Sequence, residues 1–99
     1  MLAREALDAV CLCTPTDLQP LQARQALDHG LHVICEKPLA LHRQEAASLY
    51  DLARERGVLL LPAHVVRFAQ SSLWLRDAVG SGRYGPVREA FFSRLSTRP

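Results

Sequence analysis

Lys37 is the residue of this chain whose type and position are best suited to chemistry. It is the one lysine among 12 lysine and arginine residues, and it lies in Cys35-Glu36-Lys37-Pro38 at the end of an apolar run. A lysine ammonium is a compact donor whose pKa responds to burial, so it can hold or release a proton, whereas arginine stays charged. Lys37 is therefore a candidate catalytic group, and the alternative is a solvent-facing lysine in a turn between a strand and a helix.

Polar residues also follow two other apolar runs. Thr14-Pro15 closes the first run, and His64 and Arg67 follow the third. In open parallel sheets, ligands bind beyond the carboxyl ends of the strands, so these residues and Glu36-Lys37-Pro38 are expected at one edge of a sheet. Taken singly, Thr14 is more typical of a turn or cap, and Glu36 of a partner for a nearby cation. Together they form the kind of constellation that an active site needs.

The elements that position these residues alternate along the first 68 residues. Short apolar runs predict strands buried on both faces, and amphipathic segments closed by glycines predict helices between them. The first helix is expected to be capped by Asp17 or Thr16 and to end at Gly30, and the second helix has Ala46, Leu49, Tyr50 and Ala53 on its inward face. This order predicts right-handed crossovers and a parallel sheet. The predicted strands are Asp8–Thr14, Leu31–Cys35 and Val58–Leu61, and the second helix is Arg43–Arg56.

The pattern changes in residues 69–99. A helix is predicted over Ser71–Val79, followed by a break at Gly80-Ser81-Gly82. Val87–Leu95 is only half apolar, which is typical of a strand with one wet face in an antiparallel sheet. We therefore predict one domain over residues 1–68, then a linker helix and, from about residue 84, the start of a second domain.

Length and composition exclude several classes of protein. The chain has 99 residues, 48% of them hydrophobic and 22% charged, with a net charge of +2, which fits one small globular domain at most. The slight, dispersed basicity argues against nucleic-acid binding. The longest apolar stretch, Val58–Ala63, is far short of the ~20 residues that a membrane span needs. Because Arg4, Glu5 and Asp8 follow Met1 so closely, no secretory signal is apparent, and we expect a cytoplasmic protein.

Three cysteines, Cys11, Cys13 and Cys35, form an odd set in apolar surroundings. This argues against a secreted disulfide framework and predicts buried free thiols. Cys11 and Cys13 could in principle bind zinc together with Cys35 and a histidine. No second close pair supplies the usual ligand spacing, so no metal site is expected.

An ordered series of motifs runs from residue 8 to about residue 95. It comprises Asp-Ala-Val-x-Leu-x-Thr-Pro-Thr, Ala-Leu-x-x-Gly-x-His-Val-x-Cys-Glu-Lys-Pro-Leu-Ala, His-x-x-Arg-Phe and Gly-x-Tyr-Gly-Pro-Val. In this series the chain closely resembles the Gfo/Idh/MocA family of nicotinamide-dependent oxidoreductases. The resemblance implies an α/β fold, namely part of a Rossmann domain for NAD or NADP followed by the first strand of an α+β domain for substrate binding and oligomerisation.

The resemblance also implies roles for individual residues. Lys37 would be the catalytic lysine, which polarises a substrate oxygen while hydride passes between the adjacent carbon and the nicotinamide. Thr14, Pro15, Glu36, Lys37 and Pro38 would lie along the cofactor. His64 and Arg67 would shape the rim of a site for a sugar-like or polyol substrate. Gln19 departs from the family, which usually has histidine there, so a contact near the nicotinamide ribose is changed.

Several parts of a dinucleotide site are missing from the sequence. The chain has no Gly-x-Gly-x-x-Gly turn for the pyrophosphate and no later acidic or basic residue that would distinguish NAD from NADP. The first interpretation is therefore a truncated oxidoreductase chain that is inactive alone. The second is a non-catalytic interaction module. In either case the strand at residues 8–14 would have an unpaired edge, so we expect self-association or docking on another chain.

Overall fold

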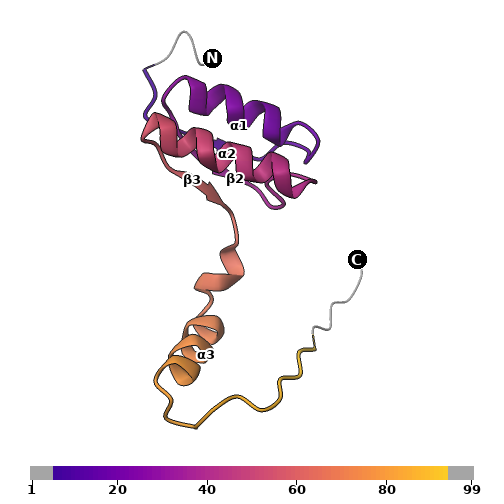
Figure 1. Cartoon of the computed structure of the whole chain (residues 1–99), viewed down its shortest axis with the longest axis vertical. Helices are drawn as coiled ribbons and strands as arrows, with labels where there is room; N and C mark the ends of the chain where they lie inside the picture. The colour runs from indigo at the N-terminus through magenta and orange to yellow at the C-terminus, as the bar shows by residue number, and fades with distance from the viewer. Residues whose placement is uncertain (1–5, 94–99) are drawn as a thin grey trace. The chain divides into compact units, whose positions relative to one another are not determined.

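A computed structural model of the chain describes residues 6–93 (Figure 1). The chain divides into two compact units, Met1–His64 and Val65–Pro99, and each is described by itself. This division falls a few residues before the predicted domain boundary at residue 68. Within the described part of the chain, no helix is both long and apolar enough to cross a bilayer.

The first unit is built on a three-stranded parallel sheet. Its strands are β1 (Ala9–Leu12), β2 (His32–Cys35) and β3 (Leu60–Pro62), in the order β1-β2-β3. Leu12 is in register with Cys35, and Cys35 with Pro62. The predicted parallel sheet is confirmed, although β1 is shorter than the predicted Asp8–Thr14 and β3 begins two residues later than predicted.

Two helices, α1 (Gln19–Asp28) and α2 (Arg43–Arg56), connect the strands and pack on the same face of the sheet (Figure 1). The predicted bounds of α2 are confirmed, and Gly57 ends it with φ 67°, a left-handed conformation that glycine adopts without steric cost. The predicted cap of α1 is wrong. Leu18 occupies the N-cap without a side-chain bond, and its backbone N–H donates to the Pro15 carbonyl at 3.0 Å.

The core of the first unit lies between the helices and one face of the sheet. The prediction that the strands are buried on both faces is wrong, because both helices cover the same face. On the opposite face Ile34 is 46% exposed and Leu61 53% exposed. Tyr50, predicted to face inward, is also exposed at 43%. The buried hydrophobic residues are Ala23, Ala26, Leu27, Leu31, Val33, Cys35, Leu39, Leu49, Ala53 and Leu60.

The second unit contains a short 3₁₀ helix, η1 (Val65–Phe68), and α3 (Gln70–Gly80). The predicted linker helix is therefore confirmed and extends one residue further at each end. The predicted strand from residue 87 does not form up to Ser93, while Arg94 and Leu95 lie outside the described residues. A strand is stabilised by hydrogen bonds to a neighbouring strand, and residues 65–93 contain no strand that could supply them.

Candidate functional site

The carboxyl ends of the three strands lie at one edge of the sheet. Because Leu12, Cys35 and Pro62 are in register, the segments that follow them leave the sheet side by side. Backbone hydrogen bonds fix this arrangement. The Glu36 N–H donates to the Leu12 carbonyl at 2.9 Å, and the Ala63 N–H donates to the Cys35 carbonyl at 2.8 Å. The structure thus brings Thr14-Pro15, Glu36-Lys37-Pro38 and His64 to a common edge, as the sequence predicted.

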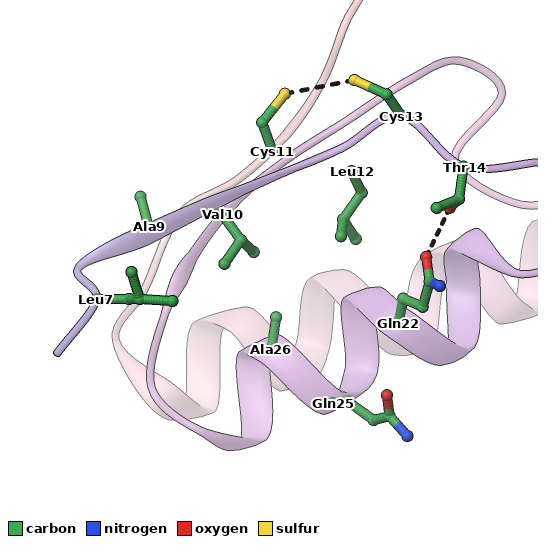
Figure 2. A pocket seen from close by; sticks show the side chains of 10 residues that line it. All are labelled: Leu7, Ala9, Val10, Cys11, Leu12, Cys13, Thr14, Gln22, Gln25 and Ala26. Carbon is green, nitrogen blue, oxygen red and sulfur yellow. Dashed lines mark hydrogen bonds between the residues drawn. The ribbon is translucent and has the colours of Figure 1, made fainter. Parts of the chain in front are cut away.

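Two glutamines of α1 hold the Thr14 segment. Gln19 donates from Nε2 to the Thr14 carbonyl at 2.8 Å. Figure 2 shows the second bond, in which the Thr14 hydroxyl donates to Gln22 Oε1 at 2.6 Å. Gln19 is 2% exposed, so its amide is a fixed anchor rather than a mobile surface group. Sequence reasoning noted Gln19 only as a departure from the family and missed Gln22. The available signal was a pair of glutamines in the first turn of the helix after Thr14-Pro15.

The segment after β2 presents its polar groups to solvent. Glu36, Lys37 and Pro38 are all exposed, and the Lys37–Pro38 peptide bond is cis. The Lys37 backbone N–H donates to Glu36 Oε2 at 3.2 Å, which places the carboxylate beside the lysine backbone. An exposed ammonium and a carboxylate on neighbouring residues can bind a polar ligand there through charge-assisted hydrogen bonds.

The two residues expected at the rim belong to different units. His64 follows β3, is exposed, and donates its backbone N–H to the Pro62 carbonyl at 2.8 Å. It therefore lies at the same edge of the sheet as Lys37. Arg67 is exposed in η1 of the second unit. Its role at the rim stays a prediction.

The three cysteines do not share one environment. Cys35 is 0% exposed, and this burial raises the pKa of its thiol. Cys11 and Cys13 are exposed, so the prediction of buried thiols is correct only for Cys35. The pKa of the Cys13 thiol is raised chiefly by its hydrogen bond with Cys11, and the negative charge of Glu36 adds to this increase. Glu36 is close to the end of β1 because its backbone N–H donates to the Leu12 carbonyl.

The residues at the sheet edge fit the nicotinamide half of a dinucleotide. Gln19 Oε1 is buried and has no hydrogen-bond partner among residues 6–93. Thr14, Glu36 and Lys37 add a hydroxyl, a carboxylate and an ammonium at the adjacent strand ends. This donor and acceptor set suits ribose and carboxamide groups. The structure thus describes half of a Rossmann-type nucleotide-binding sheet, with a polar site at the carboxyl edge.

The sequence of residues 1–64 matches the Gfo/Idh/MocA family, described as an oxidoreductase family with an NAD-binding Rossmann fold. The chain belongs to this family of NAD(P)-dependent oxidoreductases. Residues 1–64 also coincide with the first compact unit. The matched region therefore contains the three-stranded sheet, both covering helices and the candidate site except for Arg67.

Two similar proteins are named for reactions on sugar-like compounds. The chain is 37% identical over 94 residues to 1,5-anhydro-D-fructose reductase of Ensifer adhaerens, a match that covers 94% of this chain and 28% of that protein. It is 43% identical over 68 residues to D-xylose 1-dehydrogenase (NADP(+)) 2 of Haloferax volcanii, covering 69% of this chain and 21% of that protein. The chain thus spans about a quarter of the length of these relatives.

Solved structures give the same fold. The WlbA dehydrogenase of Bordetella pertussis, in complex with NADH and UDP-GlcNAcA, superposes with a TM-score of 0.81 at 33% sequence identity. The match covers 86% of this chain and 25% of that dehydrogenase. Myo-inositol 2-dehydrogenase of Lactobacillus plantarum superposes with a TM-score of 0.74 at 26% identity, covering 82% of this chain and 24% of that enzyme.

Proposed function

We propose that this chain is part of an oxidoreductase that transfers hydride between NAD or NADP and a sugar- or polyol-like substrate, with Lys37 as its catalytic residue. The observation that carries the proposal is the placement of Thr14-Pro15, Glu36-Lys37-Pro38 and His64 at one carboxyl edge of a parallel sheet. The sugar-processing relatives support the class of substrate. A cytoplasmic location is supported by three free cysteines.

Each residue has a defined part in this proposal. The nicotinamide, when bound, supplies or accepts the hydride. In reduction the Lys37 ammonium gives a proton to the substrate oxygen, and in oxidation the neutral Lys37 amine takes that proton from it. Glu36, Thr14, Pro15 and Pro38 line the nicotinamide end of the cofactor.

The neighbours of this segment keep the site in shape. Gln19 and Gln22 fix the Thr14 segment through its carbonyl and hydroxyl groups. His64 and Arg67 form the substrate rim.

Cofactor binding can be measured directly on the chain. Purified protein is titrated with NADH and with NADPH while the nicotinamide fluorescence is recorded. Saturable micromolar binding that weakens in Glu36→Ala supports a cofactor site retained in this chain. Absence of binding would show that the chain alone does not hold the cofactor. The role of Lys37 would then be decided by the activity of a chimera.

The catalytic role of Lys37 can be tested in a chimera. The matched 94-residue segment of the Ensifer adhaerens reductase is replaced by the corresponding part of this chain, and reduction of 1,5-anhydro-D-fructose is measured. Lys37→Met should lower kcat by about 10²–10⁴-fold, a larger change than in the KM for the nucleotide, because it removes the proton donor. Arg54→Lys, exposed on α2, is the matched control and should keep full activity. An active Lys37→Met chimera would contradict the proposal.

A second candidate function is self-association through the edge of β1. This strand lies at one end of the sheet order β1-β2-β3, so within residues 6–93 one of its edges has no partner strand, and the Asp8 and Leu12 carbonyls point toward β2. Because backbone direction alternates along a strand, the N–H and C=O groups of Ala9, Cys11 and Cys13 face the free edge. A hollow of about 520 Å³ beside the strand, lined by Val10, Leu12 and other residues of β1 and α1, adds apolar surface (Figure 2). We infer that a second copy of the chain pairs here across a two-fold axis.

Sedimentation velocity tests this second function. The chain should sediment as a dimer, and Ala9→Pro should convert it to a monomer. Proline removes an outward N–H at the first strand residue, where a strand tolerates it, and leaves the bonds to β2 intact. A wild-type monomer, or a dimer that Ala9→Pro does not change, would exclude pairing at this edge.

A further inference from the structure

Cys11 and Cys13 form an exposed pair of thiols that the proposed oxidoreductase chemistry does not use. Cys11 lies in β1 and Cys13 directly follows it, and their sulfur atoms are 3.7 Å apart on the same side of the chain (Figure 2). In the same view, Val10 and Leu12 point the other way, toward α1. The strand is thus anchored on its helix side by apolar side chains and held at its edge by β2, while both sulfurs face solvent. The two thiols are positioned by the fold rather than by chance rotation of a flexible loop.

The separation between the two sulfurs fits a shared metal ion. Two thiolates bound to tetrahedral Zn²⁺ at about 2.3 Å each lie about 3.8 Å apart, which is close to the observed 3.7 Å. We propose that Cys11 and Cys13 form a two-thiolate site for a thiophilic divalent cation of the Zn²⁺ class. The sulfurs provide half of a tetrahedral shell, and water or a small added ligand completes it.

A disulfide fits the same pair less well. Its sulfurs must approach to about 2.0 Å, and its Cα atoms lie within about 4.4–6.8 Å. Residues two apart on a strand have Cα atoms about 6.6 Å apart, at the upper end of that range. Closing the bond would therefore distort β1, whereas binding a tetrahedral metal needs almost no movement of either sulfur.

The rest of the described chain limits the site to these two residues. Among residues 6–93, no three histidine, cysteine, aspartate or glutamate side chains gather closely enough to hold a metal. Cys35 is in register with Leu12, so it lies on the helix side of the sheet and is 0% exposed. The expectation of no metal site rested on the lack of a second close pair of ligands. A two-thiolate site with open positions does not require one.

Titration of the full, reduced chain with ZnCl₂ in a calorimeter tests this proposal. We expect one Zn²⁺ per chain, and affinity lowered by at least about tenfold in either Cys11→Ser or Cys13→Ser. Both side chains are exposed, so both variants should fold, which thermal melts without metal can verify. Cys35→Ala is the matched control and should change the affinity by less than about twofold, because that sulfur faces the core.

A second measurement identifies the ligands independently of affinity. Co²⁺ bound by the same pair should give a thiolate-to-cobalt charge-transfer absorption that is lost in Cys11→Ser and in Cys13→Ser. Bound Zn²⁺ should also protect both thiols from alkylation by iodoacetamide, seen as the absence of the corresponding mass gain. The proposal is overturned if Zn²⁺ fails to bind, if it binds equally well to both serine variants, or if saturating Zn²⁺ leaves the alkylation of both thiols unchanged.

Discussion

The two units of this chain differ in how their apolar residues are used. Within residues 6–93, all ten buried hydrophobic residues belong to the first unit, where the sheet and two helices enclose them. Among residues 65–93 none is buried, and Trp74 and Phe91 are 65% and 88% exposed. The second unit nevertheless contains a helix of 11 residues. A local pattern can thus specify an element, while a core requires elements from distant parts of the chain to meet.

This difference explains where the candidate site lies. Lys37, Thr14 and His64 follow strands that are hydrogen bonded to one another, so their relative positions are fixed by the first unit alone. Arg67 follows the last of these strands but belongs to the second unit. A site that needs geometry to within about 0.5 Å is best placed on the rigid unit.

The largest effect is expected from the core of the first unit. Leu27→Ala removes a side chain that is 0% exposed between α1 and the sheet, and it should lower the free energy of unfolding by about 2–5 kcal/mol. Urea denaturation followed by far-ultraviolet circular dichroism measures this loss. Leu21→Ala on the same helix, where the leucine is 60% exposed, should change stability by less than about 0.5 kcal/mol. Similar losses in the two variants would contradict the assigned core.

A smaller effect is expected at the junction of β2 and β3. The Leu59 backbone N–H donates to His32 Nδ1 at 2.9 Å on the face of the sheet that the helices leave open. His32→Ala should cost about 0.5–1.5 kcal/mol, because the bond is lost but water can reach the freed N–H. Gln44→Ala, exposed on α2, serves as control in the same denaturation experiment. An unchanged midpoint in His32→Ala would show that this bond does not stabilise the sheet.

The sequence predicted those features that depend on neighbouring residues. The apolar stripe and Gly57 define α2 without reference to the rest of the chain, and the short apolar runs identify the strands. The Val87 segment was predicted as a strand from its own alternation, but a strand needs a partner that residues 65–93 do not supply.

The same reasoning separates the parts of the site that could be predicted from those that could not. The ends of the strands located Thr14 and Lys37. The support of Thr14 by Gln19 and Gln22, and the exposure of Cys11 and Cys13, depend on which face of the sheet the helices cover. That choice is a tertiary property, and no local pattern encodes it.

The pH dependence of stability should distinguish the buried thiol from the rest of the first unit. Burial raises the pKa of Cys35 above the ordinary value of about 9, so the folded state holds this proton more tightly than the unfolded state. Its contribution to stability is complete below pH 9 and is lost as the pH rises toward the raised value in the fold. Denaturation at several pH values should therefore show declining stability above pH 9. Cys35→Ala should be less stable throughout but decline less steeply, and parallel curves would contradict the assignment.

The smallest effect is expected from the second unit, and measuring it tests whether the two units unfold together. Trp74 is the only tryptophan and lies in α3, so its fluorescence reports on the second unit while circular dichroism is dominated by α1 and α2. Because its indole is already 65% exposed, its emission should change little and without a cooperative step across the urea range in which α1 and α2 unfold. Coincident, cooperative transitions from both probes would show that the two units unfold together. Trp74→Phe should likewise leave the free energy of unfolding, measured by circular dichroism, within about 0.5 kcal/mol of the wild-type value, since Trp74 is not part of the core of the first unit.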